Sequence, residues 1–151
     1  MKIRSIIAVL LALLLTSCAS FGGYSPTLED ARKSDLARKH HAKYDFLYTA
    51  EEDIGAADFI ISGDSLVIIK YNRSSYGYKA VSTVKFNIPA LLQSSAESST
   101  DFLSTGILPG SAFAVKFIIA YTEPAQAFDG YKSFEFTHNG TGCTLFYKII
   151  E

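Results

Sequence analysis

The chain has 151 residues, with 14 basic and 15 acidic side chains and a formal net charge of −1. This length suits one domain with a core that needs neither disulfides nor metals, and nothing in the charge balance indicates a nucleic-acid partner. Tyr and Phe occur 9 and 11 times, Trp is absent, and β-branched and aromatic residues fall in short runs between Gly, Asn, Asp and Ser. Such a composition is typical of a β domain.

The chain begins with a segment that has the order of a secretory signal. Lys2 and Arg4 precede an unbroken apolar run from Ile6 to Leu15, and export signals share this order of positive charge followed by apolar residues. The run has about half of the roughly 20 residues that a transmembrane helix needs. We therefore interpret residues 1–17 as a signal peptide.

Directly after the apolar run stands Leu15-Thr16-Ser17-Cys18, an aliphatic residue and two small ones before a cysteine. This segment resembles the lipobox of bacterial lipoproteins. Small side chains let a peptidase approach the backbone, and the thiol supplies the nucleophile for thioether formation. The resemblance implies a diacylglyceryl group on the Cys18 sulfur, cleavage between Ser17 and Cys18, and acylation of the new amino terminus. The alternative is an ordinary cleaved signal in which Cys18 is a chance residue.

Lipidation at Cys18 predicts a protein held in the bacterial cell envelope, because several acyl chains together give stable membrane anchoring. Ala19 follows the cysteine, whereas Asp in that place marks inner-membrane retention in many two-membrane bacteria, so the outer membrane is favoured over the cytoplasmic membrane. Loss of Lys2 and Arg4 takes the basic side chains from 14 to 12 against 15 acidic ones, which gives the mature chain a charge of −3. Cys143 is then the one other cysteine, so no internal disulfide can form.

The first part of the mature chain is read as a tether and a helix. Residues 19–25 are mostly small and include two glycines, which suits a flexible tether. Ser25-Pro26 can supply an N-cap and a first helical residue, and the charged segment at 27–43 predicts a solvated helix. Residues 44–50 read either as the end of this helix or as a first strand, because their aromatic residues alternate.

Strands dominate the rest of the chain. Apolar runs at 58–61 and 66–71 flank Ser62-Gly63-Asp64-Ser65, which predicts a hairpin whose strands are covered on both faces. A strand at 78–88 alternates cleanly, so that Tyr78, Ala80, Ser82, Val84 and Phe86 are expected on one face. The further expected elements are an end to this strand at Pro89, a Ser-rich loop at 93–105, a strand at 113–121, and a hairpin of 134–138 with 143–149.

About six or seven strands joined mostly by short turns predict a mainly β fold, preceded by the charged helix. This pattern favours an antiparallel β-sandwich or a small barrel. The alternative is an α+β fold with the helix packed on one open sheet. We divide the chain into a signal peptide at 1–17, the lipidated cysteine with tether and helix at 18–43, and a single β-rich domain at 44–151.

His138 and Cys143 are the sharpest candidates for chemistry. A turn over the four residues between them would set them opposite each other on adjacent strands, where thiolate and imidazole could work together. If Asn139-Gly140 alone forms the turn, Cys143 faces Phe136 instead. The same face is apolar and no oxyanion loop or third orienting residue is identifiable, so we predict no catalytic site. An envelope hydrolase or transferase that uses Cys143 and His138 is the alternative.

His40 and His41 are adjacent, so on a helix they point about 100° apart and cannot clamp one metal ion together. A metal site would need His138 as well, and we expect neither a metal nor a cofactor. The basic run at 38–43 could contact anionic headgroups, but acidic residues on either side favour a solvated helix.

Exposed Tyr, Arg and Asn together are typical of binding surfaces, and such residues cluster around one loop between residues 71 and 78. The alternative is that Tyr71 and Tyr78 are buried at strand ends. We predict a membrane-anchored envelope lipoprotein whose β domain binds a ligand or a protein or glycan partner, or has a structural role. Arg73 and Tyr76 are the first binding residues to test.

Overall fold

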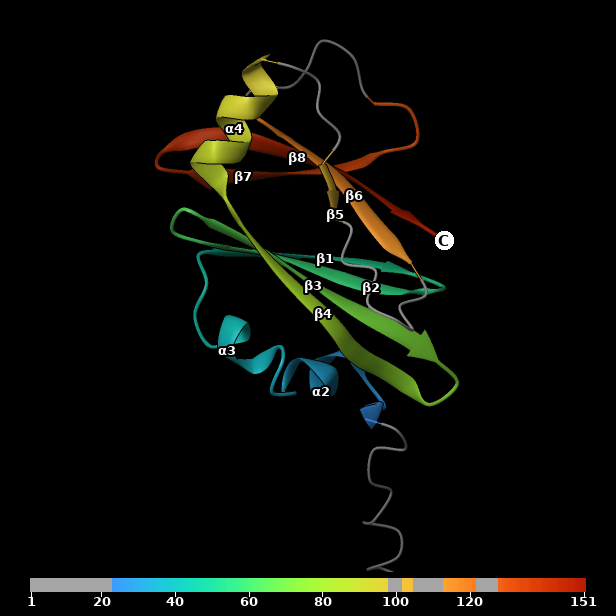
Figure 1. Cartoon of the computed structure of the whole chain (residues 1–151). Helices are drawn as coiled ribbons and strands as arrows, with labels where there is room; N and C mark the ends of the chain where they lie inside the picture. The colour runs from blue at the N-terminus through green and yellow to red at the C-terminus, as the bar shows by residue number, and fades with distance from the viewer. Residues whose placement is uncertain (1–22, 98–101, 105–112, 122–127) are drawn as a thin grey trace, which may run out of the picture.

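The computed structural model describes residues 23–97, 102–104, 113–121 and 128–151. Their strands form two antiparallel sheets that pack face to face (Figure 1), which confirms the expected mainly β sandwich with eight strands instead of about six or seven. The first sheet has the order β1 (Phe46–Glu52), β2 (Gly55–Ser62), β3 (Ser65–Ser74), β4 (Gly77–Asn87), and the second has the order β5 (Phe102–Ser104), β6 (Ala114–Ala120), β8 (Thr141–Ile150), β7 (Lys132–His138).

The main core lies between the two sheets. Inward-facing residues of β2 and β3, among them Phe59 and Ile68, meet Phe117 of β6 and Leu145 of β8, and all four are at most 1% exposed. At the edges, Tyr48 of β1 stacks on Phe134 of β7 with ring centroids 4.2 Å apart. Burial of this apolar surface is the principal force that holds the sandwich together.

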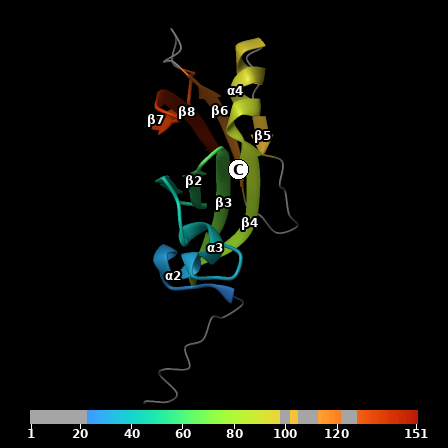
Figure 2. The same ribbon diagram turned by 90° about the vertical axis from the view of Figure 1, so that its left-hand side faces the viewer.

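A second, smaller core covers the outer face of the first sheet. Two short helices, α2 (Leu28–Arg32) and α3 (Arg38–His41), replace the single helix expected at 27–43, and they lie on that face in both views (Figures 1 and 2). Ala31 and Ala37 are buried here against Ile69 and Tyr71 of β3. The expectation of a purely solvated segment is therefore wrong, whereas β2 and β3 are covered on both faces as expected.

A β-bulge in β4 changes which residues share a face. Tyr71 pairs with Ala80 but Lys70 pairs with Ser82, so one extra residue stands in β4 and the alternation is reversed beyond it. Tyr78 and Ala80 belong to the outer core, whereas Phe86 packs on the core between the sheets. The clean alternation from Tyr78 to Phe86 predicted one shared face, and that prediction is wrong because periodicity cannot reveal an inserted residue.

The Ser-rich stretch after β4 differs from the expected loop at 93–105. Helix α4 spans Ile88–Glu97, and β5 follows at Phe102–Ser104. Asn87 caps this helix by accepting a hydrogen bond from the Ala90 N–H at 3.0 Å, and Pro89 stands in its first turn, where proline is tolerated. Ile88, Leu91 and Leu92 are buried in the main core, so α4 closes one end of the sandwich.

The expected signal peptide and Cys18 lie outside the described residues. Within the part of the chain that the structure describes, no helix combines the length and apolarity required to cross a membrane.

Candidate functional site

The turn between β3 and β4 carries the residues singled out for binding. Tyr76 has the largest exposed fraction of any large apolar side chain among the described residues, at 66%. Its N–H donates to the Ser74 Oγ at 3.1 Å, which fixes the backbone just before Gly77, a residue with φ of +107°. The aromatic ring is therefore presented to solvent on an ordered turn.

Arg73, the second residue predicted for binding, is held against the sheet. Its guanidinium lies over the Tyr78 ring, 5.6 Å from the centroid, and 4.0 Å from the Glu51 carboxylate. The Tyr78 hydroxyl donates to the same carboxylate, and this bond, with burial, raises the pKa of Tyr78. Tyr71 and Tyr78 are buried, as the alternative interpretation had it. Arg73 supports the turn, and Tyr76 is the residue that projects from it.

The first described residues brace this turn from one side. Ser25 and Tyr78 exchange two backbone hydrogen bonds, of 2.7 and 2.8 Å. A Cβ on Gly77 would stand 2.0 Å from the Ser25 carbonyl oxygen, so only glycine permits this approach. The Tyr76 turn and the start of the fold thus pack together at the lower end of the molecule in Figure 1.

A buried polar network lies beneath the two short helices. Asp58 of β2 is fully buried, and its carboxylate accepts hydrogen bonds from Arg32 Nε at 2.9 Å and Nη2 at 2.7 Å. The Thr49 hydroxyl donates to the same carboxylate at 2.7 Å. His41 Nε2 lies 3.1 Å from both the carboxylate and the Tyr71 hydroxyl. These contacts tie α2 and α3 to the sheet.

Burial sets the protonation of this network. Desolvation lowers the pKa of His41, although the Asp58 carboxylate opposes the shift. Desolvation and the same carboxylate raise the pKa of Tyr71, so its hydroxyl stays protonated. Arg32 keeps its charge because its hydrogen bond to Asp58 raises its pKa. With every group engaged and Asp58 closed off from solvent, the arrangement has the features of a structural clamp.

His138 and Cys143 are not opposite each other. Asn139 and Gly140, with φ of 49° and 78°, form the turn on their own, so Cys143 pairs with Phe136. The His138 imidazole contacts Asp64 at 2.9 Å, whereas the thiol contacts the Thr141 carbonyl at 3.7 Å. Burial raises the pKa of Cys143 and keeps the thiol protonated, which disfavours a nucleophilic role.

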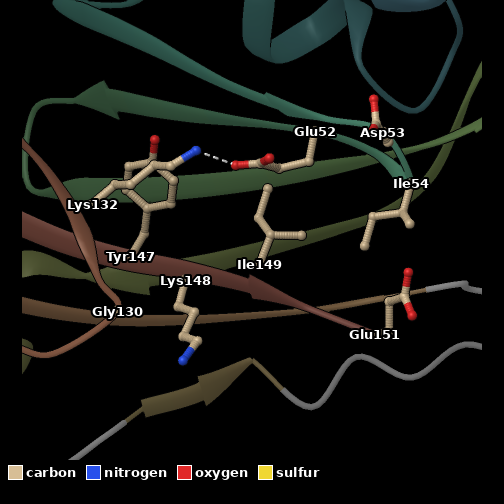
Figure 3. A pocket seen from close by; sticks show the side chains of 9 residues that line it. All are labelled: Glu52, Asp53, Ile54, Gly130, Lys132, Tyr147, Lys148, Ile149 and Glu151. Carbon is tan, nitrogen blue, oxygen red and sulfur yellow. Dashed lines mark hydrogen bonds and ion pairs between the residues drawn. The ribbon is translucent and has the colours of Figure 1, made fainter.

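A groove with a volume of about 410 Å³ lies at one open end of the sandwich (Figure 3). Five charged side chains line it, but Glu52 and Lys132 form an ion pair with each other, and Lys148 points away from that pair in Figure 3. The Tyr147 hydroxyl bonds the Tyr48 hydroxyl at 2.9 Å. Acidic and basic side chains thus stand together in this groove, and they define no single ligand chemistry.

The sequence contains a signal for the buried network. Asp58 stands in Gly55-Ala56-Ala57-Asp58-Phe59-Ile60-Ile61, where it is the one charged residue of an otherwise apolar strand, and such a carboxylate requires a partner. The sequence does not indicate that Arg32, among several basic residues of the helical segment, is the partner of Asp58. This segment has no strong apolar stripe that would show which of its residues face the sheet. Within the described part of the chain, no group of three or more His, Cys, Asp or Glu is placed to hold a metal ion.

Comparisons of the chain with models of protein families, with curated proteins and with solved structures give no match.

Proposed function

We propose that the chain is a lipid-anchored protein of the bacterial cell envelope that acts by binding a partner, with Tyr76 as the central contact residue. The observation that carries the binding role is the Tyr76 ring, 66% exposed on a turn that is held by Ser74 and braced by Ser25. The anchoring role is supported by the lipobox-like segment that ends at Cys18. The partner is a protein or glycan of the envelope.

The bracing of the turn favours binding because a backbone that is already fixed loses little conformational freedom when the turn is covered. Tyr76 is held by Ser74, and Gly77 packs directly on Ser25. Aromatic residues on such turns frequently supply the main contact of an interface. Arg73, which is engaged with Glu51, would support Tyr76 and contribute less itself.

The spacing between lipid and fold would keep the domain close to the membrane. Four residues lie between Cys18 and Gly23, and a fully extended chain spans at most about 17 Å from one to the other. A Cβ on Gly23 would lie 3.3 Å from the Lys79 side chain of β4, so the start of the fold is close to the Tyr76 turn. A partner that reaches Tyr76 would therefore stand at the membrane surface as well.

The anchor is tested by Cys18→Ala in the full chain. We expect loss of fatty-acid labelling and release of the protein from the membrane fraction, because the substitution removes the thioether sulfur. Serine at the same position should behave in the same way. A variant that remained lipidated would refute the anchor and leave the binding role of Tyr76 to be judged on its own test.

The contact is tested by Tyr76→Ser against Tyr121→Ser. Tyr121, 48% exposed, follows β6 in the other sheet and controls for loss of an exposed aromatic side chain. In-cell crosslinking from a photoreactive analogue at position 76 should give a defined adduct, and co-purification of that partner should fall at least about tenfold for Tyr76→Ser only. Equal recovery of the partner by both variants, at unchanged melting temperatures, would refute the contact.

A further inference from the structure

A hollow of about 140 Å³ on the outer face of the first sheet gathers three lysines. Lys39 comes from α3, Lys43 lies just after this helix, and Lys85 comes from β4. Ile60 and Val67 form its apolar floor. Lys85 is distant in the sequence from Lys39 and Lys43, so the complete basic cluster exists only in the folded chain.

The β-bulge in β4 is the reason that Lys85 takes part. Without the inserted residue, strict alternation from Tyr78 and Ala80 would place Lys85 on the opposite face. With the bulge, Lys85 pairs with Val67 and Thr83 with Ile69, and both Val67 and Ile69 belong to the outer core. The bulge therefore turns the end of β4 so that a lysine stands beside α3.

The hollow is uniformly basic. No acidic side chain lines it, and among the described residues none of the three lysines forms an ion pair. Three acidic residues stand close to the lining along the chain. Asp35 pairs with Arg38, Asp45 accepts the Gly63 N–H at 2.7 Å, and Asp64, between Ser62 and Ser65, contacts His138 at 2.9 Å. None of them forms an ion pair with the three lysines, so these ammonium groups have no carboxylate partner among the described residues.

Polar donors complete the lining. The hydroxyls of Ser62 and Ser65 border the hollow, and His40 Nε2 is buried with no hydrogen-bond partner among the described residues. Burial, with the positive charges of Lys39, His41 and Lys85, lowers the pKa of His40, so the positive potential of the lysines reaches its ring. A buried ring nitrogen without a partner is unfavourable unless a ligand supplies one.

We infer that this hollow, the basic pocket, binds a phosphate group. Its volume of about 140 Å³ is large enough to admit a phosphate group. The ammonium groups of Lys39, Lys43 and Lys85 neutralise the anion, and the serine hydroxyls donate to its oxygens. Lysines serve as phosphate ligands by acting as point charges of this kind.

The phosphate comes from an anionic phospholipid headgroup or from a free phosphate compound. The headgroup source rests on the proposed lipid anchor and agrees with the arrangement of the elements. Helices α2 and α3 and the first described residues lie at the same end of the molecule, away from the second sheet (Figures 1 and 2). An anchor just before Gly23 would bring the basic pocket near the headgroups.

The test uses the chain from residue 18 with Cys18→Ser, which retains every described residue and carries no lipid. It is mixed with phosphatidylcholine vesicles, with the same vesicles containing phosphatidylglycerol, and separately with inorganic phosphate while the His40 and lysine signals are followed by NMR. Binding to the phosphatidylglycerol vesicles alone identifies the headgroup source. Saturable shifts at His40 with inorganic phosphate, without vesicle binding, identify a free phosphate compound.

Lys85→Gln and Lys148→Gln form the matched pair, because both remove one exposed positive charge and Lys148 lies on β8 of the other sheet. Lys85→Gln should weaken binding about fivefold, whereas Lys148→Gln should change it less than about twofold. Equal weakening by both variants, or no binding in any arm, overturns the basic pocket. Because this protein has no lipid, the outcome is independent of whether Cys18 is acylated in the cell.

Discussion

Replacement of Arg32 by Met is expected to destabilise the whole sandwich. Met keeps the length and apolar character of the side chain but removes the guanidinium that bonds Asp58 twice. Asp58 is completely buried, and Arg32 is 24% exposed. The variant thus leaves a carboxylate inside the protein without its ion-pair partner, which is far more unfavourable than loss of a surface pair.

The size of the effect follows from this geometry. Removal of one partner of a buried ion pair costs about 3 to 5 kcal/mol. The Thr49 hydroxyl and His41 still contact the Asp58 carboxylate, so we expect the lower end, about 3 kcal/mol. For a domain of this length that corresponds to a fall of about 10 °C in Tm.

The assay is urea and thermal unfolding followed by far-UV circular dichroism, because the chain contains no Trp. Lys33→Met is the control, since Lys33 pairs with Asp30 at the surface and its replacement should change stability far less than loss of the buried pair. Adding Asp58→Asn to Arg32→Met should restore at least about 1 kcal/mol by removing the uncompensated charge. If the single variant is as stable as the parent, or the double variant gains nothing, the buried charge is not the cause.

Three further predictions concern pH, thiol reactivity and the Tyr76 turn. The fold lowers the pKa of His41, so the stability that His41 contributes is complete above pH 6.5 and decreases as the pH falls below that value. The urea midpoint of the parent should therefore fall with pH in this range, and that of His41→Gln should fall less. A midpoint that does not change with pH would contradict this. Iodoacetamide should label Cys143 only after denaturation, since the thiol is buried and its pKa is raised; labelling of the native protein would refute this. Gly77→Ala should lower the free energy of unfolding by about 2 kcal/mol or more, because the new Cβ would meet the Ser25 carbonyl oxygen. Gly142→Ala is the control, since a Cβ there would have no neighbour within 4 Å. Equal losses in both variants, measured by calorimetry, would contradict the steric argument.

The sequence predicted those parts of the fold that depend on local patterns. The hairpins around Gly63 and around Asn139-Gly140 follow from turn residues and flanking apolar runs, and both are present. Apolarity on both faces of the first hairpin correctly indicated that both faces are covered. These features need only a few neighbouring residues to be specified.

Features that depend on distant contacts were missed. The bulge in β4 is visible only from its pairing with β3, and it decides that Lys85 joins Lys39 on the outer face. The loop predicted at 93–105 is wrong for its first five residues, which belong to helix α4; their Ser-rich composition shows no helical period, and the cap at Asn87 lies several residues earlier. The Tyr76 turn was recognised from composition, but the support of Arg73 by Glu51 requires the paired sheet.

The two central strands each bury one charge, on opposite faces of the first sheet. Asp58 of β2 holds the helical layer, and Lys70 of β3 faces the other sheet, where its Nζ donates to the Phe113 carbonyl at 3.2 Å. Burial lowers the pKa of Lys70. Apolar packing alone would allow the helical layer or the second sheet to cover either face of the first sheet. Buried charges of opposite sign require different partners, so they distinguish the two faces. We interpret the pair as a device that fixes which layer covers which face.

This arrangement makes the basic pocket dependent on the clamp at Asp58. Lys39 and Lys43 belong to the segment that Arg32 and His41 tie to the sheet, whereas Lys85 belongs to the sheet itself. At temperatures well below the melting temperature, Arg32→Met should therefore weaken phosphate binding because it loosens the clamp. Lys33→Met should not weaken binding, although it also removes one positive charge. If the two variants bind equally, the lysines act as independent surface charges and the clamp has no part in placing them.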